Sequence, residues 1–452
     1  MSKLPEWARP SGQHVGRGIR RPLLGRTGVI FVTHRKILLL VFSLILGGAF
    51  FWHNYHVVPN PITLILNNPS SDLSSQSSGT NWAMAGYNLQ HTRYVTNASS
   101  QPHGRLLWST EPNYLEGGSY PAIADGTLHV GSHFKFIALK TESGQVLWEK
   151  ETPGLINSAP ALAGDKVYYG STDQYVYALD RLTGETQWAS KVNDRTRGSP
   201  TVHNGYVFVG STDRHIYALD ADNGDHLWNF KTSNVQNNPP SLHNGILYFA
   251  SIQDLHSANY RTGQARMNFR TRGISSFYAP VVANGLVYLV SDGGILTSKS
   301  EIREVPGRWA IERLWRIFWI RGFPVPDPPP QHGFQWRFST QLPGVFIRSA
   351  PAVTPEAFYV GDDSGLFYAR GAKDPSKEIW TTTLDAGIES SPVIVGDIIY
   401  VGTTAGSLYA LNRNNGSELW RLSLGSGISL PPSYAEGKLF VRTDDGRLHA
   451  VE

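Results

Sequence analysis

The chain has 452 residues, of which 12% are aromatic and only 17% charged, and its 45 glycines suit a protein of many short strands and turns. It contains no cysteine, which excludes structural disulfides, thiolate metal sites and a lipid-modified N-terminal cysteine. The net charge is +4, but the basic excess lies in residues 1–36, and the remainder is slightly acidic. A near-neutral body with a basic tail is not the pattern of a nucleic-acid-binding protein.

An apolar segment follows the basic tail. Residues 37–52 read ILLLVFSLILGGAFFW, without a charge, and as a helix they would span about 24 Å of a hydrocarbon core about 30 Å thick. Aromatic residues end this segment, and no Lys or Arg follows until Arg93. We therefore predict a single-pass anchor over residues 37–56, with residues 1–36 as a basic cytoplasmic tail and the rest exported to the periplasm or cell surface. A cleaved signal peptide is the alternative.

Residues 57–80 form the link between the predicted anchor and the remainder of the chain. The stretch NNPSSDLSSQSSGT, residues 67–80, is rich in serine. Such composition is typical of a flexible tether. We expect residues 57–80 to be a linker and residues 81–452 to be the folded domain.

The folded part repeats itself about every forty residues. YGSTDQYVYALDRLTGETQW at 169–188 returns as VGSTDRHIYALDADNGDHLW at 209–228. The clearest copies share an Ala, a polar residue two positions later, a Gly, and a Trp four positions after that Gly. Repeats of this length indicate propeller blades. The tryptophans that mark the copies are Trp108, Trp148, Trp188, Trp228, Trp336, Trp380 and Trp420, and Met267 occupies the same place in one copy.

Each repeat has the pattern of four short strands. Runs such as KVYYG, YVYAL and QWAS are β-branched or aromatic, and turn residues separate them. A further strand, opened by proline, precedes each set. The last copy stops after three strands, whereas the strand around Trp108 is not preceded by the three strands that would complete its own blade. The pattern predicts an all-β, eight-bladed propeller of four-stranded blades, closed by an N-terminal strand that completes the last blade.

The repeat resembles a known family. Its Ala-x-Asp-x-x-x-Gly-x-x-x-Trp pattern is similar to the tryptophan-docking motif of the quinoprotein-like propellers, whose repeats are named after pyrroloquinoline quinone (PQQ). NWAMAGYNLQHTRY, residues 81–94, also resembles the segment that leads into the first blade of that family. The resemblance implies that the tryptophans are structural and pack against the neighbouring blade. It leaves the function open, because dehydrogenases, assembly scaffolds and binding domains share the motif.

The resemblance does not extend to a catalytic site. PQQ dehydrogenases of this family hold a metal-bound quinone in the axial funnel, with an Asp base and often a disulfide, which this chain cannot form. The recurring acids, among them Asp173, Asp213 and Asp362, lie in the turn between second and third strands, where Asp accepts local backbone donors. We predict no catalytic residue, no metal ligand and no cofactor. PQQ with Ca²⁺ belongs to the alternative, a PQQ-dependent dehydrogenase.

The favoured prediction is a membrane-anchored, non-enzymatic protein-interaction or assembly scaffold, with a protein partner and no nucleic acid. An extracytoplasmic ligand-binding module is a second alternative. Loops between blades share one face of a propeller with the turns between second and third strands, and such loops commonly carry binding. Ordinary solvated charge is the alternative interpretation of the arginines there. The candidate partner-binding residues on this face are Arg195, Arg197, Arg272 and Arg348, with Glu389 opposing them.

A segment of about thirty residues, 301–330, interrupts the fifth blade. Pro306 and Gly307 predict a helix that begins at Arg308, and Gly322 with Pro324 predicts its end. Its apolar residues keep helical spacing. One interpretation is a helix packed onto its own blades, with Trp315 and Trp319 in the core. The other is an exposed helix that uses these two residues to dock a partner or to lie in the membrane interface.

Overall fold

The computed structural model describes residues 36–37, 39–45, 68–98, 100–111, 114–115, 119–235, 237–252, 254–270, 278–291, 294–300, 308–328, 332–340 and 343–452. The chain divides into two compact units, Met1–Asn54 and Tyr55–Glu452. In the first unit, residues 36–37 and 39–45 are helical. Among the described residues, no helix combines the length and the apolarity that a membrane crossing requires. Most of the predicted anchor, including residues 46–56, lies outside the described residues.

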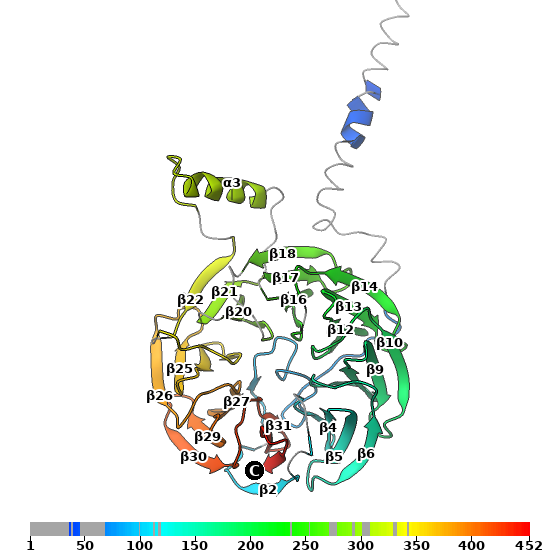
Figure 1. The fold of residues 1–452 in the computed structure, drawn as a ribbon, viewed down its shortest axis with the longest axis vertical. Coiled ribbons are helices and arrows are strands. Elements are labelled where there is room, and N and C mark those ends of the chain that lie inside the picture. The colour runs from blue at the N-terminus through cyan, green and yellow to red at the C-terminus, as the bar shows by residue number, and fades with distance from the viewer. Residues whose placement is uncertain are drawn as a thin grey trace, which may run out of the picture. The chain divides into compact units, whose positions relative to one another are not determined.

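The described part of the second unit is a ring of eight sheets, the blades (Figure 1). Seven sheets have four strands, and the sheet of blade 7 has a fifth, because β1 (Tyr94–Val95) pairs parallel with β27 (Val393–Val395). Seven blades are antiparallel meanders of four consecutive strands, and their fourth strands lie at the outside of the ring. Blades 1 to 4 contain, in order, β3 (Ala122–Ala124), β4 (Thr127–Ser132), β5 (Lys135–Lys140), β6 (Val146–Glu151), β7 (Ala161–Ala163), β8 (Lys166–Gly170), β9 (Tyr175–Asp180), β10 (Thr186–Lys191), β11 (Thr201–His203), β12 (Tyr206–Gly210), β13 (His215–Asp220), β14 (His226–Lys231), β15 (Ser241–His243), β16 (Ile246–Ala250), β17 (Asp254–Asn259) and β18 (Ala265–Arg270).

Blades 5 to 8 follow the same plan, with the helix α3 (Arg308–Ile320) inserted in blade 5. Their strands are β19 (Val281–Ala283), β20 (Leu286–Ser291), β21 (Gly294–Lys299), β22 (Phe334–Phe338), β23 (Ala352–Val353), β24 (Ala357–Gly361), β25 (Leu366–Gly371), β26 (Glu378–Thr383), β27 (Val393–Val395), β28 (Ile398–Gly402), β29 (Ser407–Asn412), β30 (Glu418–Ser423), β31 (Ser433–Ala435), β32 (Lys438–Arg442) and β33 (Leu448–Val451). Two short strands precede the blades, β1 (Tyr94–Val95) and β2 (Leu106–Ser109).

The hydrophobic core lies between neighbouring blades. Second strands such as β12 are buried along their whole length, whereas fourth strands such as β30 keep exposed residues on their outer side. Phe136 of blade 1 stacks on Tyr169 of blade 2 with ring centroids 4.6 Å apart. β-Branched and aromatic residues fill the space between two sheets well. The apolar faces of one blade are therefore buried only when a neighbouring blade packs against them.

The N-terminal strand closes the ring, as the sequence predicts. β2 pairs antiparallel with β33, so that Trp108 lies opposite Ala450 in the last blade. The backbone N–H of Arg105 donates to the carbonyl of Glu452 at 2.8 Å, and the Glu452 N–H returns a bond at 2.9 Å. Figure 1 shows β2 outside the C-terminal strands. An unpaired edge on β33 is thereby avoided.

Residues 82–95 lie at the centre of the ring, where the light-blue trace crosses Figure 1. Trp82 exchanges backbone hydrogen bonds with Ile123 of blade 1, at 2.8 and 2.9 Å. In five more blades, the second residue of the innermost strand donates its N–H to a carbonyl of this segment at 2.7–3.0 Å. The donors are Leu162, Leu242, Val282, Val353 and Ile394, and the acceptors are Ala83, Leu89, Gln90, Thr92 and Arg93. The segment therefore satisfies strand edges that would otherwise face an open channel.

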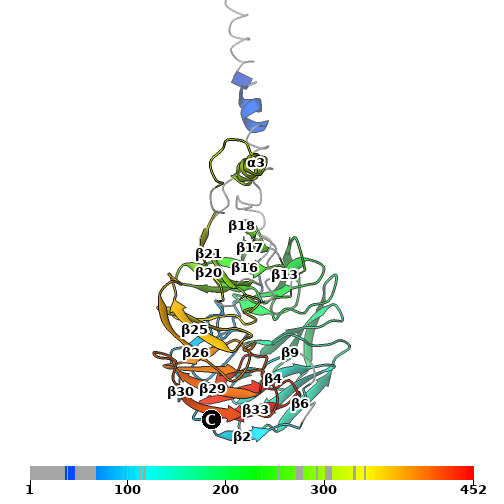
Figure 2. The ribbon, with the colours of Figure 1, turned by 60° about the vertical axis from the view of Figure 1, so that its left-hand side comes forward.

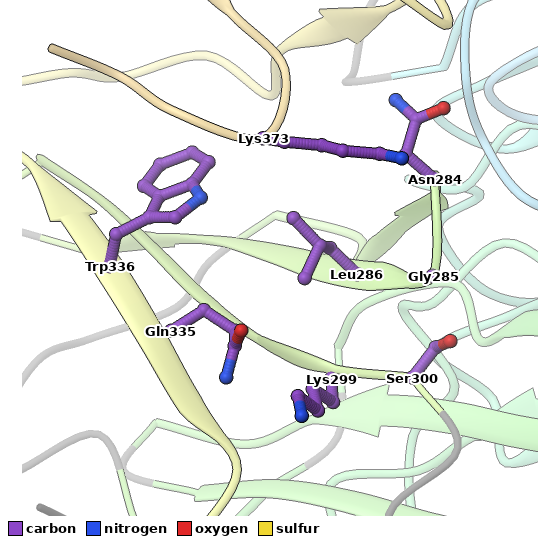
Figure 3. Close-up of a pocket in the computed structure, with 8 residues that line it drawn as sticks. All are labelled: Asn284, Gly285, Leu286, Lys299, Ser300, Gln335, Trp336 and Lys373. Atoms are coloured by element: carbon purple, nitrogen blue, oxygen red, sulfur yellow. The ribbon is translucent and has the colours of Figure 1, made fainter.

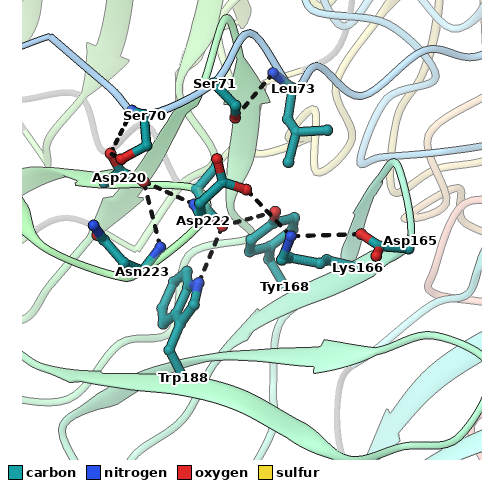
Figure 4. A network of polar contacts seen from close by, with 11 residues as sticks. Ser70, Ser71, Leu73, Asp165, Lys166, Tyr168, Trp188, Asp220, Asp222 and Asn223 are labelled. Atoms are coloured by element: carbon teal, nitrogen blue, oxygen red, sulfur yellow. Dashed lines mark hydrogen bonds and ion pairs between the residues drawn. The ribbon is translucent and has the colours of Figure 1, made fainter.

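The described part of the predicted linker is bound to the ring, which differs from the expectation of a flexible tether. The backbone N–H and the hydroxyl of Ser70 each donate to Asp220 Oδ2 at 2.7 Å (Figure 4). The Ser75 N–H donates to Val202 O at 3.1 Å, and Ser75 is buried. Serine hydroxyls and backbone groups make these contacts, so composition alone does not reveal them.

The two ends of the strands define two faces of the ring. One face carries the turns between first and second and between third and fourth strands, and residues 68–75 lie on it, against Asn204 and Asp220. We call it the N-terminal face. The opposite face carries the turns between second and third strands and the links between blades, and we call it the rim face. α3 connects the third and fourth strands of blade 5, so its connection belongs to the N-terminal face. Figure 2 shows the helix outside the ring of strands.

Candidate interaction site

The repeated tryptophans join neighbouring blades. The indole N–H of Trp188 donates to the carbonyl of Ala221 in blade 3 at 3.0 Å (Figure 4). Trp148 bonds Arg181 O at 3.2 Å in the same way, and Gly184 lies so close to its ring that an added Cβ would be 2.6 Å from it. The same N–H bond to a carbonyl of the next blade is made by Trp108, Trp228, Trp380 and Trp420. These residues are part of the scaffold.

Trp336 departs from this pattern and lines a pocket of about 450 Å³. Its indole nitrogen is buried without a hydrogen-bond partner, whereas the other docking tryptophans donate to a carbonyl of the next blade. Figure 3 shows the pocket between Trp336, Leu286 and the aliphatic parts of Lys299 and Lys373. Both lysines are exposed, so the pocket is open to solvent. It lies where Trp336 does not make the hydrogen bond to the next blade that the other docking tryptophans make.

The segment at the ring centre itself contains buried polar side chains. His91 and Arg93 are almost fully buried, and the guanidinium donates to the carbonyl of His91 at 3.0 Å. Burial lowers the pKa of His91 to about 3, with a further contribution from Arg93. Burial also lowers the pKa of Arg93 to about 10, and the nearby Tyr120 opposes that shift. Arg93 is therefore still a cation at neutral pH, whereas His91 is neutral.

The candidate arginines lie in exposed loops of the rim face. Arg195 and Arg197 lie close to the carboxyl of Asp194. The pKa of that carboxyl is lowered, mainly by a hydrogen bond from the backbone N–H of Arg195 and further by the charges of both arginines. Arg348 pairs with Asp363 at 3.4 Å and lies over the ring of Phe346. The structure therefore provides two separate charged groups on one face. Arg272 lies outside the described residues.

Near Arg348, one tyrosine marks the inner edge of the rim face. Burial raises the pKa of Tyr278 to about 12; Glu389 adds to the shift and Arg348 opposes it. Glu389 and Arg348 are thus both close to Tyr278, although they come from the links after blades 6 and 5. Sequence reasoning did not single out Tyr278, because a lone Tyr before the Ala-Pro that opens a first strand has no distinctive pattern.

The recurring aspartates serve their own turns. Asp173 accepts the N–H of Tyr175 at 3.0 Å and the hydroxyl of Tyr177 at 2.7 Å. Asp362 accepts the Ser364 N–H and the hydroxyl of Tyr368, at 3.0 and 2.7 Å. Across the described residues, no three His, Asp or Glu side chains gather as a metal-binding group. The oxygens of Asp173 and Asp362 are thus engaged in their own turns, which is the structural role that the sequence pattern indicated for the recurring aspartates.

α3 begins and ends at the predicted residues, but its tryptophans are bonded within the insertion. The indole of Trp315 donates to Pro326 O at 2.8 Å, and that of Trp319 donates to Asp327 Oδ1 at 2.8 Å. The rings of Phe318 and Phe323 meet edge to face with centroids 5.3 Å apart. Residues 322–328, the proline segment, therefore fold back along the helix. Both tryptophans are still more than one third exposed.

A family model described as outer membrane protein assembly factor BamB matches residues 93–303 and 329–452. The chain belongs to this family. The gap between the two matched ranges contains α3 and the proline segment, so the insertion is outside the family pattern. No curated protein matches the chain.

Solved structures share the fold at low sequence identity. BamB from Moraxella catarrhalis is 15% identical, with a TM-score of 0.58, over 77% of this chain and 97% of that one. The quinohemoprotein alcohol dehydrogenase from Comamonas testosteroni is 14% identical, with a TM-score of 0.64, over 88% and 82% of the two chains. The computationally designed Ika8 protein is 13% identical, with a TM-score of 0.61, over 77% and 99%. Because assembly factor, enzyme and design share this ring, the likeness establishes the fold and not the chemistry.

Proposed function

We propose that this BamB-family protein is a non-enzymatic interaction or assembly scaffold, tethered outside the cytoplasmic membrane, whose protein partner docks on the rim face. The observation that carries the proposal is the arrangement of the ring. Its centre is filled by residues 82–95 of the same chain, whereas the rim face presents exposed arginines on loops of a rigid scaffold. Loops held in this way commonly carry binding.

The tether rests on the sequence. The apolar run at 37–52, preceded by eight basic residues against one Glu, favours an anchor with the N-terminus inside. The family name supports a role in protein assembly at membranes. A PQQ-dependent dehydrogenase is the less favoured function, because the chain cannot form the disulfide often found in such enzymes, and the recurring aspartates Asp173 and Asp362 are engaged in their turns.

The test is charge reversal on the rim face of the full-length protein. We expect Arg195→Glu with Arg197→Glu to lower recovery of co-purifying protein at least about fivefold after extraction from membranes, because rim charges steer association. The melting temperature should change little, since both side chains are exposed.

The matched control is Lys140→Glu with Lys373→Glu, which reverses two exposed charges at or next to the ends of third strands, on the N-terminal face. Equal loss of recovery in the control would show that net charge, and not the rim face, governs the interaction. Stoichiometric binding of PQQ with Ca²⁺, accompanied by dye reduction with an alcohol or an aldose sugar, would contradict the scaffold assignment.

A further inference from the structure

α3 carries an apolar stripe that the protein leaves uncovered. Ile311, Leu314 and Phe318 follow one another on one side of the helix and are 62%, 53% and 43% exposed. A helix with a side of this kind normally buries it against a core. Because these side chains stay exposed, the interpretation of α3 as a core helix does not hold for them.

The insertion is built to hold this stripe in place by itself. The proline segment accepts the indole N–H groups of Trp315 and Trp319, and Phe323 packs against Phe318. These contacts lie within residues 308–328. The helix is therefore organised locally and presents a formed apolar surface, which reduces the conformational cost of binding.

The N-terminal chain and α3 reach the ring at the same face. Ser70 is bonded to Asp220 at the end of the third strand of blade 3, and α3 connects the third and fourth strands of blade 5. The fifteen residues 53–67 separate the apolar run at 37–52 from the residues bound to the ring. Extended, they would span at most about 50 Å. A membrane that holds residues 37–52 is thus within reach of the face from which α3 leaves.

The charge of the insertion also suits a lipid surface. Residues 308–328 contain four arginines against Glu312 and Asp327. Arginine near apolar and aromatic residues is typical of helices that lie in the headgroup region of anionic membranes. A protein groove would not require this excess of positive charge.

We propose that α3 with its proline segment lies in the membrane interface, with Ile311, Leu314 and Phe318 turned towards the acyl chains. This inference rests on the proposed membrane tether. It gives the tether a second contact, which turns the N-terminal face to the bilayer and leaves the rim face open to partners. The insertion is then an orienting element and not a partner-docking site.

The first experiment removes the anchor from an otherwise complete chain. Leu40→Arg with Leu44→Arg places charge within the apolar run. We expect this variant still to float with phosphatidylcholine vesicles that contain phosphatidylglycerol, and to bind less at high salt. Adding Ile311→Ser, Leu314→Ser and Phe318→Ser should lower the bound fraction at least about fivefold. Ile320→Ser is the control, because this exposed isoleucine lies on the side of the helix opposite Ile311.

The second experiment measures which side of α3 enters the lipid. Because the sequence has no cysteine, Ile311→Cys and Ile320→Cys each introduce a single thiol for a spin label. The two positions are nine residues apart, on opposite sides of the helix. In the anchored chain in the same bilayers, the label at 311 should favour dissolved oxygen over a water-soluble nickel complex, and the label at 320 should not.

The outcomes separate this inference from the proposed function. Loss of vesicle binding on disabling the anchor alone, or equal flotation of the triple serine variant, would overturn the interfacial helix. Equal nickel accessibility of both labels would do the same. Release of the unmodified chain from membranes by alkaline carbonate would instead refute the tether. Failure of the rim variants to reduce partner recovery would refute the scaffold.

Discussion

At the scale of single residues, the glycines beneath the docking tryptophans differ sharply from glycines in open turns. Gly184 has φ 75° and leaves 2.6 Å between an added Cβ and the Trp148 ring, whereas Gly285 has φ 76° and nothing within 4 Å. We expect Gly285→Ala to cost about 1–2 kcal/mol, from the left-handed backbone alone. Gly184→Ala should cost at least about 2 kcal/mol more, because the indole must move. Denaturant unfolding of both variants measures the difference; equal losses would contradict the close-contact account.

The repeat indicated the docks through its resemblance to the family motif, whereas no motif indicated the central contacts. The Gly-x-x-x-Trp spacing locates each dock because a side chain makes the contact. Residues 82–95 instead offer backbone carbonyls to the innermost strands. Every residue has a backbone carbonyl that can accept such a bond, so these contacts require no particular side chain and leave no sequence pattern. The same reason hid the contacts of Ser70 and Ser75 in a stretch that resembles a flexible linker.

At the scale of elements, closure of the ring depends on β33. We expect deletion of residues 448–452 to leave β2 and β32 with unpaired edges and to cause self-association, visible by light scattering after size exclusion. Arg105→Ala is the control, because it removes only an exposed ion pair with Glu452, worth less than about 1 kcal/mol. A monomeric, soluble deletion variant would show that the last blade is stable without its closing pair.

Elements with strong periodic or turn signals were predictable, and their tertiary contacts were not. Proline and glycine fixed both ends of α3, and the Pro-led runs fixed the innermost strands. The fold of the proline segment over Trp315 and Trp319 was missed, since it depends on two indole N–H bonds and not on a spacing.

At the scale of the whole molecule, buried histidines couple stability to pH. Burial, the largest effect in each case, lowers the pKa of His91 to about 3 and those of His129 and His256 to about 4. The unfolded chain takes up these protons near pH 6.5, so stability is constant above that value and falls as the pH drops from 6.5 towards 4. The three together should cost about 3 kcal/mol between pH 6 and pH 5.

Unfolding followed by denaturant at pH 7.5, 6 and 5 measures this dependence. His129→Gln should remove about one third of the part of the slope that His91, His129 and His256 cause. His103→Gln changes an exposed residue and should leave the slope unaltered. A free energy of unfolding that stays constant down to pH 5 would show that these histidines are charged in the folded protein.

The central segment also sets an order in time. Residues 82–110 are synthesised before any blade, yet their partners extend to Ile394 and Glu452, and the Arg105–Glu452 bond spans 347 residues. During synthesis, residues 82–110 therefore lack part of their hydrogen bonding until the final strand is made. Interrupted synthesis would leave β2 without its partner β33, and part of residues 82–95 without the later blades. The ring can therefore close only after residues 448–451 have been synthesised, and a chain released before that point is exposed to proteases.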